Sequence, residues 1–351
     1  MKFIKNVKLY GELVDIAVEN GKIAGIGKYD EDGVDFGGAK IYPGLIDTHS
    51  HGCIGRDAMD GDISEMAKWE LASGVSTWYP TTTTMSKEDI VNATMAEIDI
   101  EGGANVPGFH LEGPFINKAY KGAQNEAFVI APSLELVAEC KNVKKISLAP
   151  EVEGAMEFIR ECGLVVSLGH TATNYDTAME AFRNGARCLT HTYNRMPAIH
   201  HRDPGPIAAG VVDGRVYAEL IVDGKHVHEG AVKLLIAAYG TDKVVFISDS
   251  MPATGLGDGE YTLSGLPVTV KDGYARTPDG ALAGSTSTLF DCVRTAISMG
   301  IDEAVAVKMA SENPARMMGL NKGKIEVGYD ADFLIVDEEF NLVRAIARGE
   351  F

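Results

Sequence analysis

Two histidines separated by one residue end an apolar run near the start of the chain. The run reads YPGLIDTHSHG from Tyr42 to Gly52 and ends with His49 and His51. Side chains alternate between the two faces of a β-strand, so these two imidazoles point the same way where the strand ends. That geometry would allow both to bind one metal ion. Taken alone, the pair is better explained by a turn that happens to contain histidines, so other residues must decide between the two interpretations.

Four further residues that can bind a metal or carry a proton follow other apolar runs. They are Glu112, His170, His191 and Asp249. Imidazole nitrogens together with carboxylate oxygens suit zinc or another first-row divalent ion. A single histidine on an apolar strand is more often a core group, and Asp249 alone could be a helix N-cap. Six such residues after comparable runs are better explained by one metal site.

A divalent ion at such a site would activate water for hydrolysis, because it brings the pKa of bound water toward about 7. Hydrolysis also needs a base that takes the proton of the water and returns it to the leaving group. Asp249 follows the last of these apolar runs and is our candidate for that proton shuttle.

Positive side chains cluster in two later polar segments. HHRDPGP (200–206) contains Arg202, and DGKHVH (223–228) contains Lys225 and His226. Arginine binds phosphate in a bidentate manner, and histidine can assist. Ordinary polar loops carry the same residue types. In a chain with a net charge of −18, however, these clusters favour a phosphorylated substrate.

The middle of the chain has the pattern of an α/β fold that would hold these residues together. Apolar, β-branched runs occur eight times, with helix-like segments between them, at residues 44–49, 75–80, 106–112, 144–151, 164–170, 187–192, 216–224 and 243–250. Ser86 and Ser133 stand where helix N-caps belong, and Gly240 and Gly300 stand where helices end. Apolar strands that alternate with helices predict a parallel sheet, and eight units predict a (β/α)8, TIM-like barrel. Active sites of such barrels form at the carboxyl ends of the strands, where the six residues fall.

Both ends of the chain have the pattern of β-structure. Apolar and polar residues alternate around Asn20–Gly21, a type I′ hairpin signal, and the last thirty residues look similar. We therefore predict a small β-sandwich domain from residues 1–43 plus 321–351. The barrel would then comprise residues 44–320, with a hairpin insertion at 258–280.

Composition narrows the range of partners. The acidic balance, with an isoelectric point near 4.9, argues against nucleic acid or an anionic membrane surface. The five cysteines are scattered without C-x-x-C spacing, which fits a reducing compartment. The N-terminal segment interrupts its apolar residues with charges, so it predicts neither a signal peptide nor a membrane span. We expect a cytoplasmic protein.

The chain resembles the amidohydrolase superfamily and, within it, the N-acetylglucosamine-6-phosphate deacetylase family. The likeness spans nearly the whole chain and is carried by PGLIDTHSHG, FHLEGPF, KGAQNE, LAPE, SLGHTAT, THTYNRMPAIHHRDPG, DGKH, ISDSMPATG, DGALAGST and GKIEVGYDADFLIVD. The succession HLEGPF, GHT and H-x-Y-N-x-M is specific to this family. The resemblance implies a barrel with a small β-sandwich, a homodimer, and hydrolysis of N-acetylglucosamine-6-phosphate to glucosamine-6-phosphate and acetate.

The resemblance also implies roles for individual residues. It makes Glu112, His170 and His191 ligands of the principal metal, whereas His49 and His51 match a pair that holds a second ion in some members. Zinc is the first candidate for the one or two ions, with iron, manganese, cobalt and nickel as alternatives. The residues expected to bind substrate are Ala123, Gln124, Asn194, Arg195, Arg202, Asp223, His226, Leu282, Ala283 and Gly284.

Asp249 matches the catalytic aspartate of the family, but two substrate-binding positions depart from its pattern. At Arg195 the family commonly has a small residue whose backbone meets the phosphate. At Gln124 several members have a histidine, and glutamine can donate a hydrogen bond but cannot titrate. Because of both departures, the substrate could instead be another N-acetyl amino-sugar phosphate, such as N-acetylgalactosamine-6-phosphate.

Two other kinds of function are possible for such a sequence. Hydrolases of cyclic amides, similar to dihydroorotase or hydantoinase, commonly use a carboxylated lysine as a bridging ligand. Here Glu112 stands in the corresponding region, and no lysine ends a predicted strand. A former enzyme that only binds a sugar phosphate would be expected to lack Asp249 or a metal ligand, and all are present.

Overall fold

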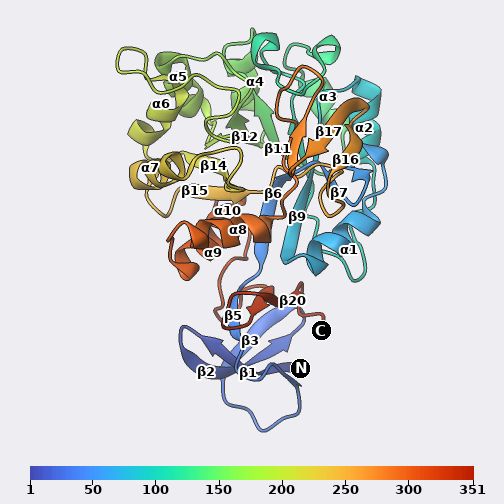
Figure 1. Ribbon diagram of the computed structural model, residues 1–351, viewed down its shortest axis with the longest axis vertical. Helices are drawn as coiled ribbons and strands as arrows, with labels where there is room; N and C mark the ends of the chain where they lie inside the picture. Colours follow the sequence, from blue (N-terminus) through green and yellow to red (C-terminus); the bar gives the residue numbers. More distant parts are fainter.

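A parallel barrel forms the larger part of the molecule (Figure 1). The computed structural model describes residues 1–351. The barrel strands are β6 (Leu45–Ser50), β9 (Val75–Thr82), β10 (Phe109–Glu112), β11 (Val143–Leu148), β12 (Val165–Leu168), β13 (Cys188–Leu189), β14 (Tyr217–Ile221) and β15 (Val244–Ile247). Neighbouring strands pair in this order, all in parallel. The backbone N–H of Asp249 donates to the carbonyl of His49 at 2.9 Å, which brings the first and last strands together. The predicted eight-stranded barrel is confirmed.

Helices surround the barrel and follow its strands (Figure 1). They are α1 (Ser64–Ala72), α2 (Lys87–Thr94), α3 (Leu134–Glu139), α4 (Ala155–Glu161), α5 (Tyr175–Asn184), α6 (Gly205–Asp213), α7 (Glu229–Tyr239), α8 (Leu289–Ser298), α9 (Glu303–Ala310) and α10 (Glu312–Met318). Ser86 and Ser133 cap α2 and α3 as predicted, because their hydroxyls accept the N–H groups of Asp89 and Leu136. None of the helices combines the length and apolar character that a membrane crossing requires.

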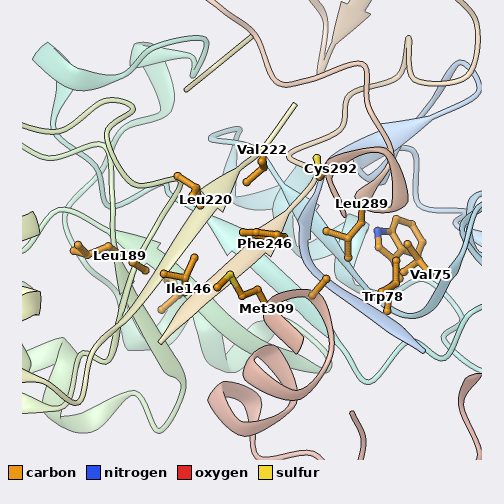
Figure 2. Packing of buried hydrophobic residues seen from close by; sticks show 14 of the residues in the cluster. Val75, Trp78, Ile146, Leu189, Leu220, Val222, Phe246, Leu289, Cys292 and Met309 are labelled. Carbon is orange, nitrogen blue, oxygen red and sulfur yellow. The ribbon is translucent and has the colours of Figure 1, made fainter. Parts of the chain in front are cut away.

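One apolar cluster of 53 buried residues joins the barrel strands to the surrounding helices. Trp78 and Phe246 contribute from strands, and Leu289 and Met309 contribute from α8 and α9 (Figure 2). Removal of this apolar surface from water is the main driving force that holds the barrel together. The barrel therefore gives the strand ends a rigid base.

The two ends of the chain share a separate mixed sheet, seen below the barrel in Figure 1. Its strands are β1 (Lys2–Leu9), β2 (Glu12–Glu19), β3 (Lys22–Gly27), β4 (Val34–Asp35), β5 (Lys40–Pro43), β19 (Phe333–Val336) and β20 (Leu342–Ile346). Asn20 and Gly21 join β2 to β3 with φ values of 51° and 73°, as a type I′ turn requires. The exact division into domains at residues 43 and 321 stays a prediction.

The segment predicted as a hairpin insertion contains three strands. They are β16 (Gly259–Leu263), β17 (Leu266–Lys271) and β18 (Tyr274–Arg276), paired antiparallel in sequence order. The turn between β16 and β17 is fixed to the barrel rim, because the Asp57 carboxylate accepts the Ser264 N–H at 2.7 Å. Leu263 consequently reaches the cavity described next. Two short strands, β7 (Gly52–Cys53) and β8 (Arg56–Asp57), lie beside the same rim.

Candidate metal centre and active site

The six residues singled out by type and spacing lie together at the carboxyl ends of the barrel strands. Each has at most 7% of its surface exposed. His49 and Glu112 belong to the ends of β6 and β10, and His51 follows β6 directly. The other three each lie two residues beyond a strand end, namely His170 after β12, His191 after β13 and Asp249 after β15. Parallel strands bring their carboxyl ends to one rim, which is why residues from 49 to 249 meet.

Glu112 lies between two groups of histidines. Its Oε1 is 3.2 Å from His49 Nε2, and its Oε2 is 3.2 Å from His51 Nε2. On the other side, Oε1 is 3.2 Å from His170 Nε2 and 3.0 Å from His191 Nε2. The residues therefore form two triads of possible metal ligands that share one carboxylate. A shared carboxylate allows the site to hold one or two ions.

The Asp249 carboxylate faces the first triad. Its Oδ1 is 3.4 Å from His49 Nε2 and 3.3 Å from His51 Nε2. The backbone of Asp249 is left-handed, with φ of 49°, and so are those of His170 and His191, with φ of 47° and 29°. Such conformations cost about 1–3 kcal/mol each in non-glycine residues and cluster at functional sites. The sharp turns after three strands bring these side chains to the cluster.

Hydrogen bonds fix the orientation of several side chains in this cluster. The Nδ1 atoms of His51 and His170 lie 3.0 Å from the backbone carbonyls of Thr81 and Tyr120. A carbonyl can only accept, so each Nδ1 donates, and the neutral ring presents its Nε2 lone pair to the cluster. This is the tautomer that a metal ligand requires.

Gln124 is held beside the cluster in one orientation. Its Oε1 accepts the backbone N–H of Thr84 at 2.6 Å, so its amide nitrogen donates to the Oε2 of Glu112. The amide therefore positions the shared carboxylate.

Electrostatic interactions keep the carboxylates ionised. Burial by itself raises the pKa of Glu112, but the imidazoles around it, His49 first, hold the pKa well below its usual value. The same balance lowers the pKa of Asp249 through His49 and His51. Conversely, burial lowers the pKa of His49, yet Glu112 and Asp249 raise it to about 9. The carboxylates thus favour a positive charge at this position, which a proton or a metal ion can supply.

A buried ion pair lies beneath the cluster inside the barrel, and sequence reasoning missed it. Lys145 of β11 and Glu219 of β14 are fully buried, and the ammonium group donates to Glu219 Oε1. The second carboxylate oxygen of Glu219 lies 3.7 Å from His49 Nδ1, and both atoms lack a hydrogen-bond partner. The signal that could have found the pair was a charged residue inside each of two apolar strands, Lys145 beside Lys144 in β11 and Glu219 in β14.

A cavity of about 420 Å³ opens above the cluster. The candidate residues that line it are His51, Glu112, Ala123, Gln124, His170, His191, Asn194, Arg195, His226, Asp249, Leu282 and Gly284. Tyr120, Tyr193 and Leu263 also line it and were not anticipated. No sequence signal pointed to Leu263, because the return of the insertion to the rim depends on the tertiary fold.

Three expected substrate residues lie outside the lining of this cavity. Asp223 instead holds His226, because its Oδ2 is 2.7 Å from His226 Nδ1. Ala283 is buried and hydrogen-bonds to the backbone of Ala275. Arg202 lies exposed in a turn, with its Nη1 2.7 Å from the Nε2 of His201. Of the metal-ligand candidates, His49 lies below the lining residues.

The barrel, together with a cluster of possible metal ligands at its rim, is that of a hydrolase of the amidohydrolase class. The Amidohydrolase family model matches residues 41–350, and the chain belongs to this family. This result agrees with the superfamily resemblance inferred from the sequence motifs.

Particular relatives narrow the comparison. An N-acetylglucosamine-6-phosphate deacetylase of Lysinibacillus sphaericus is 35% identical over 96% of this chain and 93% of its own. An N-acetylgalactosamine-6-phosphate deacetylase of Escherichia coli O157:H7 is 37% identical over 88% of this chain and 87% of its own. The crystal structure of the N-acetylglucosamine-6-phosphate deacetylase of Thermotoga maritima is 32% identical and superimposes with a TM-score of 0.89, covering 99% of this chain and 98% of that one. The chain is therefore similar in sequence and fold to amino-sugar-phosphate deacetylases.

Proposed function

We propose that the protein hydrolyses the N-acetyl group of N-acetylglucosamine-6-phosphate, giving glucosamine-6-phosphate and acetate. The observation that carries this proposal is the Asp249 carboxylate beside His49 and His51, in a cluster of two triads of possible metal ligands at the base of a cavity. A mutant deacetylase of Mycobacterium smegmatis in complex with this sugar phosphate has the same fold, with 27% identity and a TM-score of 0.90 over 99% of this chain and 98% of that one.

The cluster fits a divalent metal ion. His49 Nε2 is buried 3.2 Å from Glu112 Oε1 but is not in hydrogen-bond geometry with it, an arrangement that a cation between the two atoms would satisfy. Glu112, His170 and His191 would hold one ion, and His49, His51 and Glu112 a second. Zinc suits this donor set best, with iron, manganese, cobalt or nickel as alternatives. When bound, such an ion makes water more acidic and polarises a carbonyl group.

Asp249 is the residue assigned to proton transfer. Its low pKa makes it a carboxylate able to accept a proton from the attacking water. It then returns this proton to the sugar nitrogen as the amide C–N bond breaks, so that the amine leaves neutral and acetic acid is released, which loses its proton to solvent and becomes acetate. Gln124 keeps Glu112 oriented, and the loop of Leu282 and Gly284 together with Asn194 shapes the cavity for the sugar.

His226, which lines the same cavity, supports a phosphorylated substrate. Burial lowers the pKa of His226, but the hydrogen bond and charge of Asp223, together with the charge of Asp249, more than offset this, so the pKa lies above its usual value. A protonated His226 attracts a phosphate group and places the acetamido group over the metal cluster.

The alternative functions are less well supported by the site. Lys145 is a fully buried lysine inside the barrel, so it is the candidate for a carboxylated bridging ligand. Its ammonium group, however, donates to Glu219 and, at 3.2 Å, to the carbonyl of Thr48. No lysine lines the cavity. These contacts favour an acetamido substrate over a cyclic amide that would need a carboxylated lysine.

Acetate release from three sugars tests the proposal. They are N-acetylglucosamine-6-phosphate, its galacto epimer, and unphosphorylated N-acetylglucosamine, each assayed with metal content measured on the same sample. We expect the gluco phosphate to have the highest kcat/KM. The similarity to the Escherichia coli relative makes the galacto epimer the second candidate. No acetate from any of the three by metal-replete protein would refute the proposal.

Two further properties belong to the same proposal. The protein acts as a homodimer, which the resemblance implies, and it resides in the cytoplasm, which the five unpaired cysteines support. Light scattering at micromolar concentration measures the mass directly, and a mass of one chain would contradict the dimer.

A further inference from the structure

One arginine in the cavity has no partner. Arg195 is the only lysine or arginine among the 18 residues that line the cavity above the metal cluster. No carboxylate lies within ion-pair distance of its guanidinium, although the chain has 50 acidic and 32 basic residues. Its side chain is exposed, so the positive charge remains free to bind an anion.

The backbone of Arg195 is fixed relative to the metal cluster. The turn from His191 to Arg195 is closed by the N–H of Asn194, which donates to the His191 carbonyl at 2.9 Å. The carbonyl of Arg195 accepts the N–H of Thr171 at 3.1 Å, next to His170. Arg195 itself has a left-handed φ of 51°. Backbone hydrogen bonds at and beside two candidate metal ligands, His191 and His170, therefore fix the backbone position of Arg195.

The side chain of Arg195 lies against Gly122, which also lines the cavity. A Cβ atom placed on Gly122 would be 2.8 Å from Arg195 Nε and 3.2 Å from its Cδ. Gly122 has a φ of 60°, and its missing side chain leaves the space that the arginine occupies. The stem of the Arg195 side chain therefore packs beside Gly122, and the side chain stays exposed at the cavity.

Arg202, the other arginine expected to bind phosphate, has a different position. Its guanidinium contacts His201 in an exposed turn, and it does not line the cavity of its own chain. Within one chain, Arg195 is therefore the arginine that lines the substrate cavity.

We propose that Arg195 is the cation that binds the phosphate group of the substrate within the same chain and so determines the preference for a phosphorylated sugar. This inference rests on the proposed function. The planar guanidinium can donate two parallel hydrogen bonds to a phosphate dianion, while His226 adds a third from the same cavity.

The test compares phosphorylated and unphosphorylated N-acetylglucosamine as substrates of Arg195→Ala, Arg195→Lys and the matched control Arg294→Ala. Arg294 lies exposed on α8, outside the cavity. Loss of a charge-assisted pair predicts that Arg195→Ala raises the KM for the phosphorylated sugar by about 10- to 100-fold with little change in kcat. The kinetics for the unphosphorylated sugar should not change. Arg195→Lys should recover part of the loss, and Arg294→Ala should match the wild type.

Other outcomes would overturn the assignment. They are an unchanged KM in Arg195→Ala, an equal loss for both sugars, or a loss in Arg202→Ala but not in Arg195→Ala. Titration calorimetry with inorganic phosphate separates this inference from the proposed function, because it needs no turnover. Wild-type protein that releases no acetate but binds phosphate more than about 10-fold better than Arg195→Ala would refute only the reaction. Equal phosphate affinity would refute the role of Arg195.

Discussion

Replacement of Lys145 by methionine should destabilise the protein by several kcal/mol. Lys145 and Glu219 are both 0% exposed, and the ammonium group also donates to the carbonyl of Thr48 at 3.2 Å. Without the lysine, Glu219 Oε1 keeps only the hydroxyl of Thr48 at 2.9 Å, and Oε2 already lacks a hydrogen-bond partner. Removal of one member of a buried ion pair costs about 3–5 kcal/mol, because the other charge stays buried and uncompensated.

Equilibrium unfolding in urea measures this cost, with excess metal and separately with a chelator so that metal binding can be subtracted. The control is Lys233→Met, which removes a half-exposed i,i+4 pair with Glu229 and should cost no more than about 0.5 kcal/mol. The double variant Lys145→Met with Glu219→Leu should recover much of the loss, since it leaves no buried charge. A loss below about 1 kcal/mol in the single variant would refute this reasoning.

Three further predictions concern the site. His226 is protonated below its raised pKa, so the KM for the phosphorylated sugar should be low there and rise as pH passes through that pKa. Asp223→Asn removes the carboxylate that raises the pKa of His226, so the rise of KM should occur at lower pH in this variant. The same pH dependence of KM in the variant and the wild type would contradict the role of His226. Glu112 is shared by both triads, so Glu112→Gln should lose both ions by metal analysis, while His51→Asn should lose only one; equal losses would argue against a shared ligand. Chelation should lower the unfolding midpoint as well as activity, because ion binding stabilises the folded state, and an unchanged midpoint would exclude a bound ion.

The sequence pattern predicted the barrel well because its strands are buried on both faces. Each of the eight apolar runs overlaps a barrel strand, and caps such as Ser86 mark helices correctly. The ends of the strands were less predictable. The run at 187–192 contains a strand of only two residues, Cys188–Leu189, because the backbone turns sharply to bring His191 into the cluster. Local propensity does not encode such turns, which the tertiary structure imposes.

The candidate site was predictable where residue type and strand position coincide. His49, Glu112 and Asp249 each follow an apolar run, and parallel strands with a common direction bring such residues together. The pair of Lys145 and Glu219 was not predicted, because its members are 74 residues apart and come from strands that are not neighbours. Pairwise contacts across a barrel depend on strand order and register, which a single sequence does not specify.

The position of Arg202 could not be derived from the sequence for a similar reason. An arginine in a loop after a barrel strand can reach the cavity or lie outside it, and composition does not distinguish the two. In the structure Arg202 lies outside the cavity and Arg195 lies within it. Whether a residue of a rim loop lines the cavity therefore depends on the three-dimensional structure of that loop.

The most direct test of the central claim compares the wild type with Asp249→Asn. The measurement is acetate release from N-acetylglucosamine-6-phosphate, with metal content determined on the same samples. Wild-type protein should release acetate. Asp249→Asn should retain an ion at Glu112, His170 and His191, yet lose about 10²- to 10⁴-fold in kcat, because the proton shuttle is gone. Undiminished turnover by Asp249→Asn, or no acetate from metal-replete wild type, would contradict the account.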